Sequence, residues 1–144
     1  MACAQWWLAF DLPPANSPDI VNISDQKYVR LTTYTKDGRA KHTPVWVAGL
    51  PDNVVGTTTD SDSWKIKRLL STSSVELAAS DAKGGVADGV ETMSGTARVV
   101  DYQAADYGQI ESALLEKYGL QYRLFRFIRR LRRKEPCGIV IILD

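Results

Sequence analysis

Residues 43–69 read TPVWVAGLPDNVVGTTTDSDSWKIKRL, and this stretch decides the fold. Its β-branched and aromatic residues predict two strands, at residues 40–50 and 54–59, joined by a Pro-Asp-Asn turn. The Ser/Asp run that follows offers N-cap oxygens to a short helix beginning near Ser63. The stretch therefore predicts two consecutive strands and a helix whose N-terminus lies close to the end of the second strand.

Further strands lie on both sides of this stretch. Upstream, KYVRLTTYT at residues 27–35 is typical of a strand, and the Asp-Gly pair ending at Gly38 suits a tight hairpin. Downstream, strand patterns cover residues 75–79, 91–100 and 137–143, the last a continuous apolar run suited to a buried central strand.

Two helical patterns separate the last two strands. The first covers residues 103–118 and has an apolar stripe, with Gly119 as C-cap: Ile110, Leu114, Leu115 and Tyr118. The second repeats apolar residues at helical spacing before Pro136: Leu124, Phe127, Ile128 and Leu131. We expect both stripes to pack against the body, with the arginines of the second helix on its other side.

Six strands in the order β-β-β-α-β-β-α-α-β predict a mainly β fold of the α+β kind, a small antiparallel split β-barrel with helices over its openings. A doubly wound sheet would need helices alternating with strands throughout, and no G-x-G-x-x-G follows a strand here. We divide the chain into an N-terminal arm, residues 1–26, and a cofactor-binding barrel, residues 27–144.

Composition narrows the classes of protein further. The 144 residues carry a net charge of +1, and no window approaches 18 consecutive apolar residues, so we expect no membrane span. Two cysteines exclude a disulfide framework and a four-cysteine zinc site, and they fit a reducing, cytoplasmic location. With one histidine, His42, in the whole chain, we expect no metal site.

The strand end at Thr58 and Thr59 and the helix start at Ser63 and Lys65 have the chemistry of an anion site. Hydroxyls, free backbone N–H groups, the helix dipole and an ammonium would converge there, which suits a phosphate. The alternative from these residues alone is a capped surface helix with solvated lysines.

Two segments taken together resemble a known family: LTTYTKDGRAKHTPVWVA (residues 31–48) and TTTDSDSWKIKRL (residues 57–69). They are similar to the split-barrel flavin-binding family of pyridoxamine phosphate oxidase, and most of all to its actinobacterial branch that uses the deazaflavin coenzyme F420. The resemblance implies cofactor contacts to the ring from the PVW strand and to the ribityl chain and phosphate from the strand and helix that follow. The implied residues are Val45, Trp46, Val47, Thr58, Thr59, Ser63 and Lys65.

One departure bears on the choice of cofactor. Oxidase members tend to read Ser-Arg-Lys at the helix start, where this chain reads Ser63-Trp64-Lys65, so one phosphate-binding guanidinium is missing unless Arg68 replaces it. The resemblance therefore favours F420, with FMN as the alternative. The family's residues for the substrate phosphate have no match, which argues against pyridoxamine phosphate as substrate.

The implied activity is that of an F420-dependent oxidoreductase passing a hydride from reduced F420 to an unsaturated or quinone-like organic acceptor. The alternatives are an FMN-dependent oxidoreductase and a non-catalytic flavin- or deazaflavin-binding protein. Because the ring carries the reactive carbon, the hypothesis names no catalytic residue. Tyr118 and Tyr122 are either donors to a carbonyl or buried aromatics. The resemblance also implies a homodimer with the cofactor at the subunit interface.

Charge is concentrated in residues 120–134, which hold seven basic residues and no acidic one, leaving −6 for the rest of the chain. F420 ends in an oligoglutamate tail, which a cationic groove would bind. The candidate residues are Arg123, Arg126, Arg129, Arg130 and Arg133. The alternative is a solvated face. Nucleic acid is disfavoured because no aromatic residue interleaves the arginines as a stacking platform.

Overall fold

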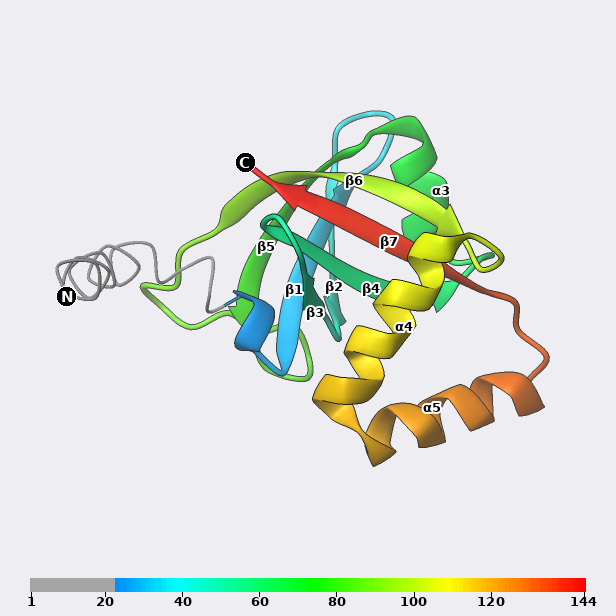
Figure 1. Ribbon diagram of the computed structural model, residues 1–144. Helices are drawn as coiled ribbons and strands as arrows, with labels where there is room; N and C mark the ends of the chain where they lie inside the picture. The colour runs from blue at the N-terminus through cyan, green and yellow to red at the C-terminus, as the bar shows by residue number, and fades with distance from the viewer. Residues whose placement is uncertain (1–22) are drawn as a thin grey trace, which may run out of the picture.

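A computed structural model describes residues 23–144, so that residues 1–22 of the arm predicted over residues 1–26 lie outside the described residues. Residues 23–25 form a helical turn, and the elements that follow are shown in Figure 1. The strands are β1 (Tyr28–Tyr34), β2 (Ala40–Val45), β3 (Ala48–Leu50), β4 (Val54–Asp60), β5 (Ser74–Ser80), β6 (Met93–Asp101) and β7 (Pro136–Leu143). The helices are α3 (Trp64–Ser71), α4 (Ala105–Tyr118) and α5 (Leu120–Leu131).

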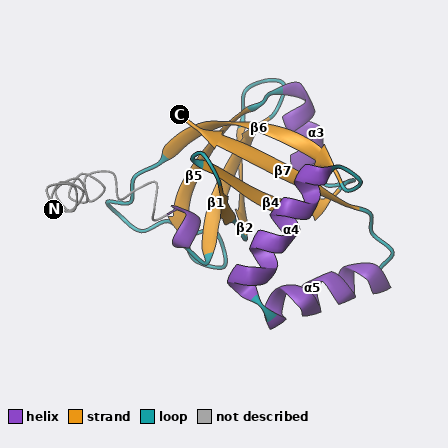
Figure 2. Ribbon diagram, viewed as in Figure 1, coloured by secondary structure: helices purple, strands orange, loops and turns teal. Residues whose placement is uncertain are grey.

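The strands form one antiparallel sheet in the order β2-β1-β5-β6-β7-β4-β3. Strands β2 and β3 stand at opposite ends of this order, yet only two residues separate them in the chain. The sheet must therefore curl until its two edges meet, as Figure 2 shows. This is the predicted split barrel, with β7 between β6 and β4 as the predicted central strand.

The prediction of one strand over residues 40–50 is wrong, and the sheet has seven strands instead of six. Val45 pairs with Val29 of β1, whereas Ala48 pairs with Gly56 of β4. A single straight strand cannot reach both edges of the curled sheet, so the chain breaks at Trp46 and Val47 and crosses from one edge to the other.

The tight turns follow the prediction. Gly38 takes a φ of 88° in the first hairpin. Between β3 and β4, Asp52 and Asn53 take φ values of 65° and 62°. Two successive left-handed residues are the requirement of a type I′ hairpin turn, and Asp and Asn are among the residues that accept it.

Apolar residues form two packed layers. Inside the barrel, alternate residues of the strands meet the two buried residues of α3, Ile66 and Leu69. Outside it, α4 packs its stripe across β3, β4 and β7, with Ile110 fully buried. Gly56 and Gly138 make this approach possible, because a Cβ on either would lie under 3.0 Å from the Ile110 side chain. The predicted packing of this helix is confirmed.

The prediction for the second helical stripe is wrong. Helix α5 packs mainly against α4 and extends away from the sheet in Figure 1. Its four predicted core residues are exposed, whereas Tyr122 and Arg129 are buried on the side facing the body. Helix α5 therefore contacts the body through the side that carries Tyr122 and Arg129, and its apolar stripe faces solvent. Within residues 23–144, no helix is long and apolar enough to cross a membrane.

Candidate functional site

A cavity of about 240 Å³ opens between the β2 end, β4, the start of α3 and the inner side of α5. It brings together five of the seven residues implied as cofactor contacts: Val45, Trp46, Thr58, Thr59 and Lys65. The other two, Val47 and Ser63, are not among its lining residues. Tyr28, Asp60, Tyr122, Phe125 and Arg129 also line it, so that the cavity has an aromatic side and a charged side.

The aromatic side is built on the break between β2 and β3. Trp46 stacks on Tyr118 of α4, with ring centroids 4.8 Å apart and an interplanar angle of 12°. Tyr122 and Phe125 tilt against the same indole, at centroid distances of 6.4 and 5.5 Å. This geometry fixes one flat wall, suited to a planar conjugated ring.

The last turn of α4 satisfies the backbone groups that the break leaves unpaired. The Val47 N–H donates to the Tyr118 hydroxyl at 3.3 Å, and that hydroxyl donates to the Lys27 carbonyl at 2.7 Å. The Lys117 ammonium donates to the carbonyls of Ser24, Gln26 and Val47 at 2.7, 2.6 and 2.6 Å. Val47 thus acts through its backbone, as an anchor behind the wall.

Burial changes the proton affinities of both anchoring groups. It lowers the pKa of Lys117 to about 8, and it raises the pKa of Tyr118 to about 12. Since the Tyr118 hydroxyl is already committed to backbone groups, it has no role as a donor to a substrate carbonyl.

The polar side of the cavity is the predicted strand end and helix start. The Thr59 hydroxyl donates to the Ser63 hydroxyl at 3.4 Å, and Lys65, two residues after this N-cap in the first turn of α3, lines the cavity. Burial, and next the neighbouring Arg68, lower the pKa of Lys65. Arg68 itself donates to Thr33 of β1 at 2.7 Å and is not among the cavity residues, so it does not replace the missing guanidinium there.

Arg129 of α5 supplies a second cation that the motif comparison did not place in the site. Its side chain is only 5% exposed, and Nε lies 3.3 Å from the Asp60 carboxylate. None of its three guanidinium nitrogens has a hydrogen-bond partner among the described residues. A buried cation normally has its donors satisfied, because leaving them unpaired costs several kcal/mol. The open donors at this cavity therefore indicate a site for an anion.

Tyr122 lies between the two sides of the cavity. It is 1% exposed, and its hydroxyl lies 3.2 Å from the Thr58 hydroxyl and 3.4 Å from Glu111 Oε2. Burial raises its pKa, so it stays a neutral donor. Of the two tyrosines considered from the sequence, this is the one that lines the cavity.

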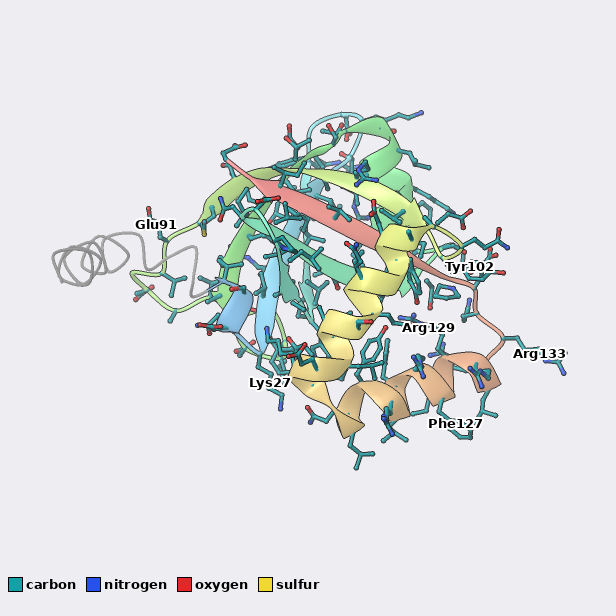
Figure 3. All side chains as sticks on the ribbon, viewed as in Figure 1. Lys27, Glu91, Tyr102, Phe127, Arg129 and Arg133 are labelled. Carbon is teal, nitrogen blue, oxygen red and sulfur yellow. The ribbon has the colours of Figure 1, made fainter. Side chains whose placement is uncertain are left out.

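A second hollow, of about 420 Å³, lies between α4 and α5 on the other side of Arg129. Its cations are Arg126, Arg129, Arg130 and Lys134. Three are partly neutralised, because Arg126 lies 3.4 Å from Glu111, Arg129 lies 3.3 Å from Asp60 and Lys134 lies 3.0 Å from Asp62. We call this second hollow the basic groove. Arg129 lines both the cavity and the basic groove and lies between them, and Figure 3 shows this arginine between α5 and the body.

No protein-family model matches the sequence, and no curated protein matches it. Solved structures do. HutZ, the heme storage protein from Vibrio cholerae, is similar over 89% of each chain, with a TM-score of 0.66 and 12% identity. The conserved hypothetical protein Rv2991 from Mycobacterium tuberculosis gives a TM-score of 0.63 at 19% identity, over 89% of this chain and 80% of that one.

A protein named F420 reductase is also similar, with a TM-score of 0.55 and 16% identity, over 85% of this chain and 91% of that one. At these identities the similarity establishes the fold. The chain has the split-barrel fold of the pyridoxamine phosphate oxidase type, and proteins of this fold include an F420 reductase and heme-binding proteins.

Proposed function

We propose that this chain is an F420-dependent oxidoreductase, which passes a hydride from reduced F420 to an unsaturated or quinone-like organic acceptor. The observation that carries the proposal is the buried Arg129 guanidinium, with open donors, across the same cavity as Lys65. Two cations beside a row of threonine hydroxyls fit a phosphate with adjoining hydroxyls, and the Trp46 wall fits a flat ring.

The protein's part in such a reaction is to position and to exclude water. Reduced F420, when bound, supplies the hydride from its ring. Lys65 and Arg129 would hold the phosphate, Thr58 and Thr59 the hydroxyl chain, and Trp46 the ring. The Tyr122 hydroxyl, kept protonated by burial and donating to Glu111, would line the site beside the Trp46 wall.

The basic groove supports F420 over FMN. FMN ends at its phosphate, whereas F420 continues into an oligoglutamate tail beyond it. A groove with four cations that begins at the phosphate-facing Arg129 offers bidentate partners to carboxylates. The arginines that line the groove and would bind the tail are Arg126 and Arg129, which face the body, and Arg130.

Heme storage, the function named for one neighbour, has less support in these residues. Histidine is the commonest protein ligand of heme iron, and the single histidine of this chain is exposed. The Nδ1 atom of His42 lies 2.8 Å from the Thr32 hydroxyl across the β1–β2 pair, and it is not among the cavity residues.

The size of the cavity supports the proposed dimer. Ligand pockets commonly measure roughly 300–1,000 Å³, and about 240 Å³ within one chain is below that range. A second copy across the open side would complete the enclosure. Light scattering should then give twice the 16.0 kDa chain mass, and a monomer that binds the cofactor at full affinity would contradict the shared site.

The test of function is a titration of the purified chain with F420 and with FMN, followed by oxidation of reduced F420 in the presence of a quinone. We expect F420 to bind more tightly. Lys65→Ala should weaken binding about 10- to 100-fold, the range for a lost charge-assisted hydrogen bond. Lys67→Ala is the matched control, because Lys67 lies on the same helix over the exposed Trp64 ring.

Each outcome distinguishes one alternative. Tighter binding of FMN would assign the site to a flavin. Binding of F420 without turnover would support the non-catalytic alternative. An unchanged dissociation constant for Lys65→Ala would show that the cofactor does not bind in this cavity.

A further inference from the structure

Helix α5 presents a continuous apolar surface to solvent. Its members recur at helical spacing, and each is between 43% and 79% exposed. We call them the apolar face of α5: Leu120, Leu124, Phe127, Ile128 and Leu131. Single exposed apolar residues are ordinary, but a contiguous stripe of five on one helix marks an interaction surface.

The apolar face points away from the rest of the molecule. At about 100° per residue, the five apolar side chains cluster on one side of α5, and Tyr122, Arg126 and Arg129 cluster on the opposite side. In Figure 3, Phe127 projects outward from the helix, and Arg129 projects inward. A helix of a water-soluble body normally has the reverse arrangement, so this face is built for contact with something else.

Arginines border the face on both sides. Arg123 and Arg130 follow one edge, and Arg132 stands near the other. Arg123, Arg126 and Arg130 also surround Phe127 at a hollow of about 260 Å³ on the surface of the helix. An apolar side chain beside guanidinium groups is the arrangement of a helix that inserts apolar residues between lipid chains and binds the phosphates above them.

We propose that the apolar face of α5 docks on an anionic lipid surface. Residues 120–134 carry seven cations and no acid, and three of these cations, Arg123, Arg130 and Arg132, border the apolar face without an ion pair among the described residues, which complements a negatively charged surface. The net charge of −4 on residues 23–119 and 135–144 does not oppose this, because these residues lie on the far side of the helix from the apolar face. The proposal rests on the apolar face and not on the proposed function, although Arg130 lies at the border of both sites.

The same charges argue against two α5 faces pairing in a dimer. Such a pair would bring two sets of arginines together with no acidic residue in either helix to neutralise them. An anionic lipid surface offers both an apolar layer and phosphates, so it accounts for the stripe and its borders together.

The test is co-sedimentation of the full chain with vesicles of phosphatidylcholine alone or mixed with phosphatidylglycerol. The bound fraction should rise with the phosphatidylglycerol content and fall with added salt. Leu124→Gln combined with Phe127→Gln should lower the partition coefficient at least about tenfold. Leu70→Gln is the control, because Leu70 is 74% exposed on α3, outside this face. Arg123→Gln combined with Arg130→Gln should weaken binding and flatten its salt dependence.

Equal binding to both vesicle types, or an equal loss in the Leu70→Gln control, would overturn the proposal. So would light scattering that shows a dimer for the wild type and a monomer for the Leu124/Phe127 variant without any vesicle binding, since a second copy would then be the occupant. Circular dichroism of each variant checks that α5 is retained.

Discussion

Helices α4 and α5 follow one another through a single glycine, and both carry apolar stripes, yet they use them in opposite ways. Helix α4 buries its stripe on the sheet, whereas α5 exposes its stripe and turns a tyrosine and an arginine inward. Gly119, with a φ of 59°, makes the change of direction between them. The difference teaches that an amphipathic pattern identifies a helix but does not by itself say which face meets the body.

The receiving surface decides the outcome. Beneath α4, Gly56 and Gly138 of β4 and β7 leave room for Ile110, and Val140 lies in the same layer. Beneath α5 there is instead the mouth of the barrel, lined by Thr58, Asp60 and Lys65. A polar and charged cavity cannot bury leucines, so the helix presents Tyr122 and Arg129 to it.

The largest effect should come from breaking the α4 contact. Ile110→Ala should lower the free energy of unfolding by about 2–5 kcal/mol, because it removes a fully buried side chain and leaves a cavity over two glycines. Leu124→Ala, the matched change on α5, should alter it by less than about 0.5 kcal/mol, since this leucine is 59% exposed. Urea denaturation measures the free energy of unfolding of both variants. Equal losses would show that α5 is packed in solution.

The fold was largely predictable because its signals are local. The Asp-Gly hairpin, the Pro-Asp-Asn turn and the alternating strands each depend on neighbouring residues, and the barrel follows from their order. The break at Trp46 and Val47 was not predictable, since it is imposed by the two edges of a closed sheet. Within TPVWVAGL the residues of lowest strand propensity, Pro44 and Gly49, lie on either side of the break, whereas the residues at the break itself, Trp46 and Val47, favour a strand.

The candidate site likewise has residues that could be predicted from the sequence and one that could not. Thr58, Thr59 and Lys65 belong to a local motif, and the structure brings them to one cavity. Arg129 enters the cavity from a helix 64 residues after Lys65. The sequence identified Arg129 only as one of five arginines of a groove for the cofactor tail, on the side of α5 that helical spacing assigns to solvent. Only the tertiary position of α5 distinguishes it from the exposed arginines.

Each of the two helices turns one cation toward the body, Lys117 on α4 and Arg129 on α5, and substitutions of these two residues compare their roles. Lys117 of α4 donates to three carbonyls, so Lys117→Met should lower the free energy of unfolding by about 2–3 kcal/mol by leaving those carbonyls unpaired. Glu116→Met is the control, because Glu116 is exposed on the same turn. A loss no larger than that of the control would mean that water replaces the ammonium at the break.

The pH dependence of Lys117 has a definite sign. Its folded pKa of about 8 lies below the value of about 10.4 for an unfolded lysine. Between these values the unfolded chain holds more protons at this site, so the contribution of Lys117 to stability rises with pH. The free energy of unfolding of the wild type, measured relative to that of Lys117→Met, should therefore rise between pH 8 and pH 10. The rise should be less than about 1 kcal/mol because the side chain is partly solvated. Thermal denaturation at several pH values checks this.

Arg129→Met should have a small effect on folding and a large one on binding. Arg129 has the same degree of burial as a core residue but no hydrogen-bonded partner, so replacing it with an apolar side chain of similar length should change the free energy of unfolding by about 1 kcal/mol or less, in either direction. The partly exposed Asp60 carboxylate keeps its hydration when the guanidinium is removed. Affinity for a phosphate-bearing ligand should nevertheless fall about 10- to 100-fold, since a charge-assisted contact is lost. Denaturation and F420 titration on one preparation separate the two effects. A strong loss of stability with unchanged affinity would show that Arg129 serves the fold, and that the arginine of α5 and the lysine of α4 are structural cations of one kind.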